Sequence, residues 1–199
     1  MHLQRLAGST IENVTAESQR QPILTGDRIA LRPWTAADAQ EVCAACQDPE
    51  IQRWTPVPSP YQHADAVSYV NETAPKVWRE GGALFAVVAI ENGALVGSIG
   101  VHSFQDGVAH IGYWTAPAAR RHGFTAEALR VLTRWFLRDR EAARVELVTE
   151  PHNVGSRMVA EKVGFTTEGI LRSRCLLRGR RTDVVMYSML PTDPAATAL

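Results

Sequence analysis

The sequence has few of the features that mark membrane-bound or secreted proteins. Its 199 residues contain no apolar run near the roughly 20 residues that a membrane-spanning helix requires. Residues 1–20 lack the apolar segment of a secretory signal and read as a polar tail. Three cysteines are an odd number and too few for a disulfide framework. We therefore expect a cytoplasmic protein without a membrane partner.

Net charge and nucleotide-binding motifs are also missing. Basic and acidic residues number 21 each, so no overall field attracts nucleic acid. Neither the G-x-x-x-x-G-K-[ST] loop nor the G-x-G-x-x-G fingerprint occurs. Cys43 and Cys46 form a C-x-x-C, but it lies in an alanine-rich helical pattern and no second pair completes a zinc set. We interpret the two cysteines as helix residues and expect no metal site.

The hydrophobic pattern predicts one domain, residues 23–191, between a polar tail at 1–22 and a short tail at 192–199. A strand at 28–34 precedes a helix that Thr35 caps and that runs to about residue 46. Four prolines make residues 48–60 irregular, with room for one helical turn, and Pro75 is expected to bend or break the helical segment 61–82.

Strands then follow in quick succession. Segments 83–90, 95–104 and 108–115 are separated by Asn-Gly and Asp-Gly pairs, which predicts an antiparallel meander. A helix at 124–140 and a strand at 143–150 complete a βαβ crossover, so the two crossover strands should be parallel. A helix at 154–163 and strands at 169–177 and 182–190 finish the chain. The predicted fold is a mixed, mostly antiparallel α/β sheet with one crossover and flanking helices.

The stretch PAARRHGFTAEAL (117–129) gathers positive charge where the crossover helix begins. Backbone N–H groups of a first helical turn have no intrahelical partners, and the helix dipole favours an anion there. Gly123 allows close approach of a ligand, and Arg120 and Arg121 add charge. A phosphate group fits this pattern. From these residues alone, a solvated basic loop is an equally open interpretation.

Two motifs in order, IGYWTAPAARRHGFTAEAL and then PHNVGSRMVAEKVGF, resemble the GNAT superfamily of acetyl-CoA-dependent N-acetyltransferases. The chain looks most like the RimJ/RimL-like branch, which acetylates N-terminal residues of ribosomal proteins, over residues 28–190. The resemblance implies acetyl-CoA as cofactor. Thr125 departs from the small residue that ends the family's [QR]-x-x-G-x-[GA] motif. The residues that the resemblance implies for coenzyme A are Trp114, Thr115, Arg120, Arg121, His122, Gly123, Phe124, Thr125, Ala126, Asn153 and Ser156.

The same resemblance implies a strand that parts from its neighbour near Pro117, with Trp114 and Thr115 exposed to the pantetheine arm. Many members carry a tyrosine two residues before the lysine of the K-x-G-F element, where this chain has Ala160. The RimL-like branch points to Ser156 as the substitute acid for the departing thiolate.

The base and the acceptor residues are less well defined by the sequence. Glu150 is our first choice as base, with His152 close by. Trp54 and His102 are candidates for the acceptor site, whereas core packing is expected for Trp34 and Tyr113.

The implied reaction is direct attack of a primary amine on acetyl-CoA in a ternary complex. The amine could belong to a protein N-terminus, a peptide or a small molecule. A non-catalytic acyl-CoA-binding or regulatory protein is the alternative. The arginine-rich hairpin at 172–181 is either solvated or contacts an acidic acceptor or ribosomal RNA, and a homodimer is left open.

Overall fold

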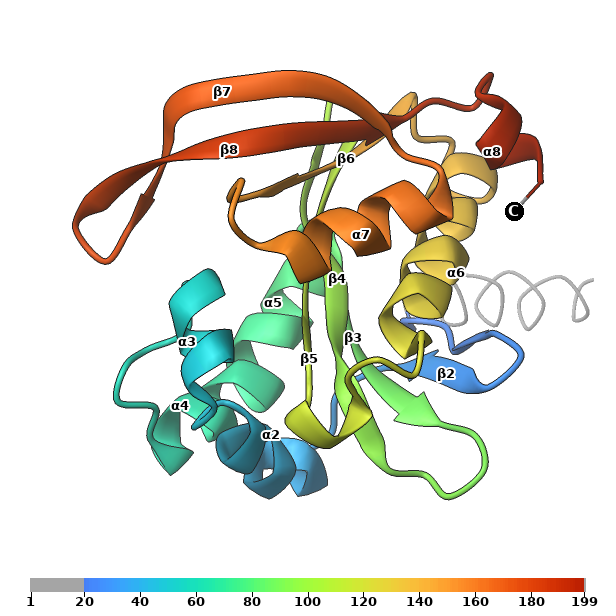
Figure 1. The fold of residues 1–199 in the computed structure, drawn as a ribbon. Helices are drawn as coiled ribbons and strands as arrows, with labels where there is room; N and C mark the ends of the chain where they lie inside the picture. Colours follow the sequence, from blue (N-terminus) through green and yellow to red (C-terminus); the bar gives the residue numbers. More distant parts are fainter. Residues whose placement is uncertain (1–19, 199) are drawn as a thin grey trace, which may run out of the picture.

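A single eight-stranded sheet organises the computed structural model, which describes residues 20–198 (Figure 1). The strand order is β1-β2-β3-β4-β5-β6-β8-β7, and every neighbouring pair is antiparallel except β5 and β6. This arrangement confirms the predicted mixed sheet with one crossover. The strands are β1 (Leu24–Thr25), β2 (Ile29–Arg32), β3 (Ala83–Ala89), β4 (Leu95–Gln105), β5 (Val108–Thr115), β6 (Arg144–Thr149), β7 (Thr166–Leu177) and β8 (Arg180–Met189).

Helices cover both faces of the sheet. In chain order they are η1 (Ala36–Asp38), α2 (Ala39–Ala45), α3 (Pro49–Trp54), α4 (His63–Ser68), η2 (Tyr69–Thr73), α5 (Ala74–Arg79), η3 (Pro117–Ala119), α6 (Phe124–Arg138), α7 (Val154–Val163) and α8 (Pro194–Thr197). Helices α6 and α7 pack on one face, whereas α2, α4 and α5 pack on the other. β3 is buried on both faces, with Phe85 in the first core and Leu84 in the second.

An apolar stripe on α6 forms the centre of the first core. Leu129, Leu132 and Phe136 are fully buried, and Trp135 packs edge-on against Phe85. The crossover helix is therefore fixed on the sheet by its apolar face, and its N-terminus is held at a defined place beside β5.

Pro75 bends its helical segment without ending it. The turn before it is a π-helix, in which the amide of Ala74 donates to the carbonyl of Tyr69. Proline has no amide hydrogen and cannot donate a helical hydrogen bond. The wider π-turn keeps the helix continuous through this position.

The C-terminal segment contains a short helix, α8, that packs on the domain. In the segment 192–199, α8 packs on the first core through Ala196, and a Cβ at Gly164 would lie only 2.5 Å from that of Ala195. Small residues on both sides allow this close contact, so the C-terminal segment is part of the domain. Residues 1–19 of the predicted N-terminal tail lie outside the described part of the chain, while Gln21 donates a 2.9 Å hydrogen bond to the carbonyl of Leu84.

Cys43 and Cys46 lie in and beside α2, as the helical interpretation predicted, and neither forms a disulfide. Burial raises the pKa of the Cys46 thiol to about 12, which keeps it protonated and unreactive at neutral pH. Between residues 20 and 198, no three His, Cys, Asp or Glu side chains cluster as metal ligands would, and no helix is long and apolar enough to cross a bilayer.

Candidate active site

β5 and β6 part after His110, several residues before Pro117, near which the resemblance implied a splay. Their parallel pairing covers Val108–His110 on β5, whereas pairing of β5 with β4 continues to Thr115. Figure 1 shows β5 continuing beside β4 toward the loop before α6 while β6 turns into the loop before α7. The edge of β5 that faces β6 is therefore left without a strand partner beyond His110.

Alternation along β5 decides which residues face this opening. The amide of Ala116 donates to Val96 on the β4 side, and the carbonyl of Trp114 lies against Gly97 of β4. Backbone groups alternate between the two edges of a strand, so those of Tyr113 and Thr115 face the splay. This geometry favours Thr115 over Trp114 as the source of backbone contacts, and the Trp114 ring packs toward the second core.

The loop before α6 has the backbone shape of an anion site. Gly123 is the N-cap at φ 82°, and Arg121 is also left-handed at φ 66°. A Cβ at Gly123 would lie 3.5 Å from Nη2 of Arg28 and 3.9 Å from Nζ of Lys162. These two cations come from distant segments, and the sequence analysis missed them because no local motif joins them to Gly123.

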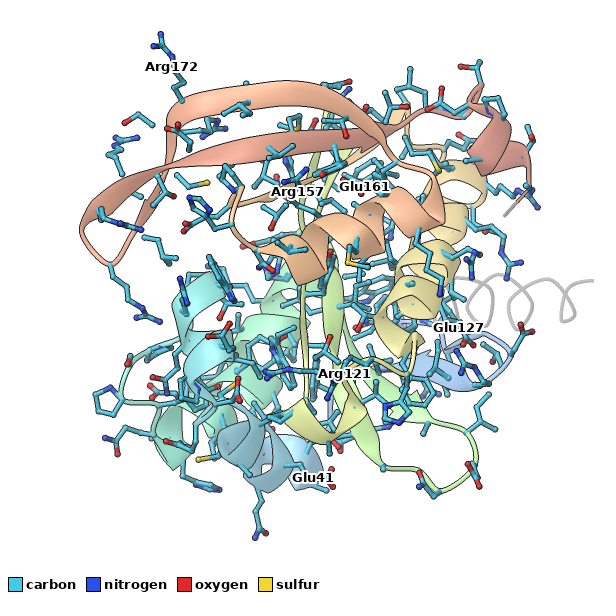
Figure 2. All side chains as sticks on the ribbon, viewed as in Figure 1. Glu41, Arg121, Glu127, Arg157, Glu161 and Arg172 are labelled. Carbon is cyan, nitrogen blue, oxygen red and sulfur yellow. The ribbon has the colours of Figure 1, made fainter. Side chains whose placement is uncertain are left out.

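A cavity of about 700 Å³ opens beside this loop. Pro117, Ala118, Arg120, Arg121 and His122 line it, and Figure 2 shows Arg121 at the front of the molecule, on the loop that leads into α6. Unpaired amides at a 15-residue helix terminus, two nearby cations and an open cavity suit a pyrophosphate group.

Arg120, one of the residues that the resemblance implies for coenzyme A, is paired within the protein. Its Nη2 lies 2.5 Å from Oδ1 of Asp48, the N-cap of α3, so its charge is compensated within the protein. Burial alone would raise the pKa of Asp48, but the hydrogen bonds from Arg120 and the Ile51 amide outweigh it and lower that pKa. Arg120 therefore ties the loop to α3 and is a weaker candidate for a phosphate contact than Arg121.

Two further contacts hold the loop in shape. Arg28 forms a 3.0 Å ion pair with Glu127 and donates to the carbonyl of His122. The hydroxyls of Thr115 and Thr125 are 2.5 Å apart and join the end of β5 to the first turn of α6. Thr125 departs from the family pattern, and this hydrogen bond to β5 gives its hydroxyl a structural role.

Asn153, Ser156 and Tyr113 meet at the N-terminus of α7. Asn153 caps the helix, its Oδ1 accepting a 3.1 Å hydrogen bond from the Ser156 amide. The Tyr113 hydroxyl lies 2.9 Å from Oγ of Ser156 and donates to the Ser156 carbonyl at 3.2 Å. Burial raises the pKa of Tyr113 to about 12, so the phenol stays protonated at neutral pH. Core packing was the role expected for Tyr113. The contact of its hydroxyl with Ser156 depends on the splay, which residue spacing does not reveal.

A second cavity, of about 400 Å³, brings Glu150 and Trp54 together. Glu150 follows β6, Trp54 ends α3, and the β7–β8 hairpin closes the space with Arg178 and Arg180. His152 also lines this cavity. His102 lies apart on β4, where its ring packs over Gly112 of β5, and it does not line this cavity. Surrounding protein atoms lower the pKa of His102 by displacing water.

Comparison with known proteins places this geometry in a family. The Acetyltransferase (GNAT) domain matches residues 28–166, which include β5, the Gly123 loop and the α7 N-terminus. The chain belongs to the GNAT acetyltransferase family.

Individual relatives agree with this assignment. The uncharacterized N-acetyltransferase p20 of Bacillus licheniformis is 29% identical over 178 residues, which cover 85% of this chain and 96% of p20. Mycobacterium smegmatis RimJ, solved with a coenzyme A disulfide, has the same fold, with a TM-score of 0.80 at 21% identity over 90% of this chain and 93% of RimJ. RimL, a ribosomal L7/L12 acetyltransferase solved with coenzyme A, gives 0.77 at 18% identity over 85% of this chain and 98% of RimL.

Proposed function

We propose that this chain transfers an acetyl group from acetyl-CoA to a primary amine, by direct attack in a ternary complex. The observation that carries the proposal is the anion-binding terminus of α6 beside the splayed edge of β5. The RimJ and RimL structures contain coenzyme A, and this chain shares their fold. RimL is named a ribosomal L7/L12 alpha-N-protein acetyltransferase, which favours a protein N-terminus as the acceptor here and the cytoplasm as the location.

The residues take distinct roles in this proposal. The amides from Arg121 to Ala126 hold the pyrophosphate, and acetyl-CoA supplies the acetyl group and the thiolate that leaves. An N–H on the free edge of β5, at Tyr113 or Thr115, polarises the thioester carbonyl. The Oγ–H of Ser156 gives its proton to the sulfur. The Tyr113 hydroxyl lies 2.9 Å from this Oγ and, by turning from the Ser156 carbonyl, donates to it as that proton leaves.

Glu150 is proposed to take the proton from the amine. A free α-amine has a pKa near 8 and is mostly protonated at neutral pH, so a carboxylate beside it is useful. The Glu150 side chain is only 17% exposed and lines the second cavity. His152 lines the same cavity and is the competing base.

Glu150→Gln and His152→Asn separate the two candidate bases. We expect Glu150→Gln to lower kcat/KM about 100-fold, within the range of general base catalysis, and His152→Asn to lower it less than threefold. Initial rates of thiol release across pH 6 to 9 provide the measurement. The reverse order of effects would assign the base to His152.

Tyr113→Phe tests whether the phenol acts through Ser156. We expect kcat to fall about tenfold while coenzyme A affinity is unchanged, because the contacts of the phenol with the Ser156 hydroxyl and carbonyl are lost. In a Ser156→Ala background the same change should have almost no effect. Tyr187→Phe is the matched control, since its hydroxyl bonds Glu161 and Arg157 on α7 but not Ser156. Equal effects of Tyr113→Phe in both backgrounds would mean a structural role only.

A further inference from the structure

The cavity that holds Glu150 has an excess of positive charge. Three arginines line it, Arg53, Arg178 and Arg180, and Glu150 is the only carboxylate among its lining residues. Arg53 lies 3.7 Å from Glu50 and over the Trp54 ring, so part of its charge is balanced. The other two arginines belong to the β7–β8 hairpin, which reaches over α3 (Figure 1).

Arg178 has a structural task that leaves its charge uncompensated. Its guanidinium donates to the backbone carbonyls of Gln52, Thr55 and Val57, and so holds the hairpin against the end of α3. Carbonyls are neutral acceptors that satisfy the N–H groups without cancelling the positive charge. The wall of the cavity therefore keeps a fixed cation.

Arg180 is held loosely. Its side chain is 79% exposed, and its Nη2 reaches Oε2 of Glu150 only at 4.0 Å, without a hydrogen bond between the two. An exposed pair at this distance contributes little stability. Both groups are thus available to a ligand, one as an acceptor of amine protons and one as a cation.

Thr182 adds an unsatisfied polar group to the same wall. It is 8% exposed, and within the described chain its Oγ1 has no hydrogen-bond partner. A buried hydroxyl without a partner is unfavourable. It follows Arg180 by two residues on β8 and lines the cavity, where rotation of its covered hydroxyl would let a ligand oxygen bond to it.

We propose that the acceptor is a primary amine with a carboxylate or phosphate within a few bonds, bound with its amine at Glu150 and its anion at Arg180 and Thr182. This inference rests on the acetyl transfer proposed above. An acidic peptide N-terminus and a small anionic amine share this chemistry.

Matched acceptors test the preference. Tetrapeptides Ser-Asp-Asp-Ala, Ser-Asn-Asn-Ala and Ser-Lys-Lys-Ala separate charge from size, and phosphoethanolamine against ethanolamine does so for small amines. In one of the two sets, we expect kcat/KM to be at least tenfold higher for the anionic acceptor than for its neutral counterpart. A preference among the peptides would identify the acceptor as an acidic peptide N-terminus, and a preference for phosphoethanolamine would identify it as a small anionic amine. The preference should shrink at high salt, because exposed charges are screened.

Arg180→Glu should remove the preference or reverse it. Arg172→Glu is the matched control, because it makes the same change of charge on β7 at an exposed position that projects away from the body of the molecule (Figure 2). Equal rates for charged and neutral acceptors, or equal effects of the two variants, would overturn the inference while leaving acetyl transfer in place. Absence of turnover with every amine would instead refute the proposed reaction, and the inference with it.

Discussion

Gly123→Glu is expected to raise the Kd for coenzyme A by about 100-fold or more. The new carboxylate would lie where the pyrophosphate is proposed to bind, beside Lys162 and beside Arg28, whose charge Glu127 already pairs. Two like charges 4 Å apart repel by about 4 kcal/mol at an effective dielectric constant of 20. Even if the carboxylate moves and lowers this repulsion by a third, the Kd for coenzyme A rises about 100-fold. Equilibrium titration with coenzyme A gives the Kd directly.

Backbone strain has to be separated from this electrostatic effect. A side chain at φ 82° costs roughly 1–2 kcal/mol of folding stability. Gly93→Glu introduces the same residue at φ 72°, in a hairpin turn where a Cβ meets no atom within 4 Å. We expect both variants to lose similar stability and only Gly123→Glu to lose coenzyme A. Unchanged affinity in Gly123→Glu would place the pyrophosphate elsewhere.

Ser156→Ala is expected to lower kcat about 100-fold with the coenzyme A Kd within threefold of wild type. General acid catalysis contributes at this scale, and alanine removes the only hydroxyl proton that Ser156 can give. The helix cap survives, because Asn153 accepts its hydrogen bond from the backbone amide of Ser156. The change therefore tests the chemistry of the side chain rather than the start of α7.

Kinetics with a better leaving group sharpen this experiment. An acyl donor with a more acidic thiol needs less protonation, so the difference between wild type and Ser156→Ala should narrow with it. Ser156→Thr, which keeps a hydroxyl, should recover part of the rate. A kcat that Ser156→Ala leaves unchanged would remove this residue from the mechanism.

Local sequence signals predicted the elements that position the site. Asn-Gly and Asp-Gly turns defined the meander, the spacing of Leu129, Leu132 and Phe136 defined the crossover helix, and Gly123 marked its start. Each of these depends on residues within a few positions of one another, which is why sequence patterns detect them.

Contacts between distant segments were beyond that approach. Arg28 and Lys162 reach Gly123 from 95 and 39 residues away, Arg120 is paired with Asp48, and Tyr113 meets Ser156 across the splay. Such pairs depend on how helices and strands pack in three dimensions. The sequence pattern likewise placed Trp54 and His102 in one site, whereas packing brings Trp54 to Glu150 and leaves His102 over Gly112.

Amine-dependent release of free thiol from acetyl-CoA tests the central claim most directly. Purified protein, acetyl-CoA and the peptide and small-amine sets described above are sufficient, with mass spectrometry to identify the acetylated product. We predict thiol release above the background rate with at least one anionic amine, one acetyl group added per molecule, and loss of that rate in Ser156→Ala. Tight binding of coenzyme A with no amine-dependent thiol release would contradict the account and support a non-catalytic acyl-CoA-binding protein.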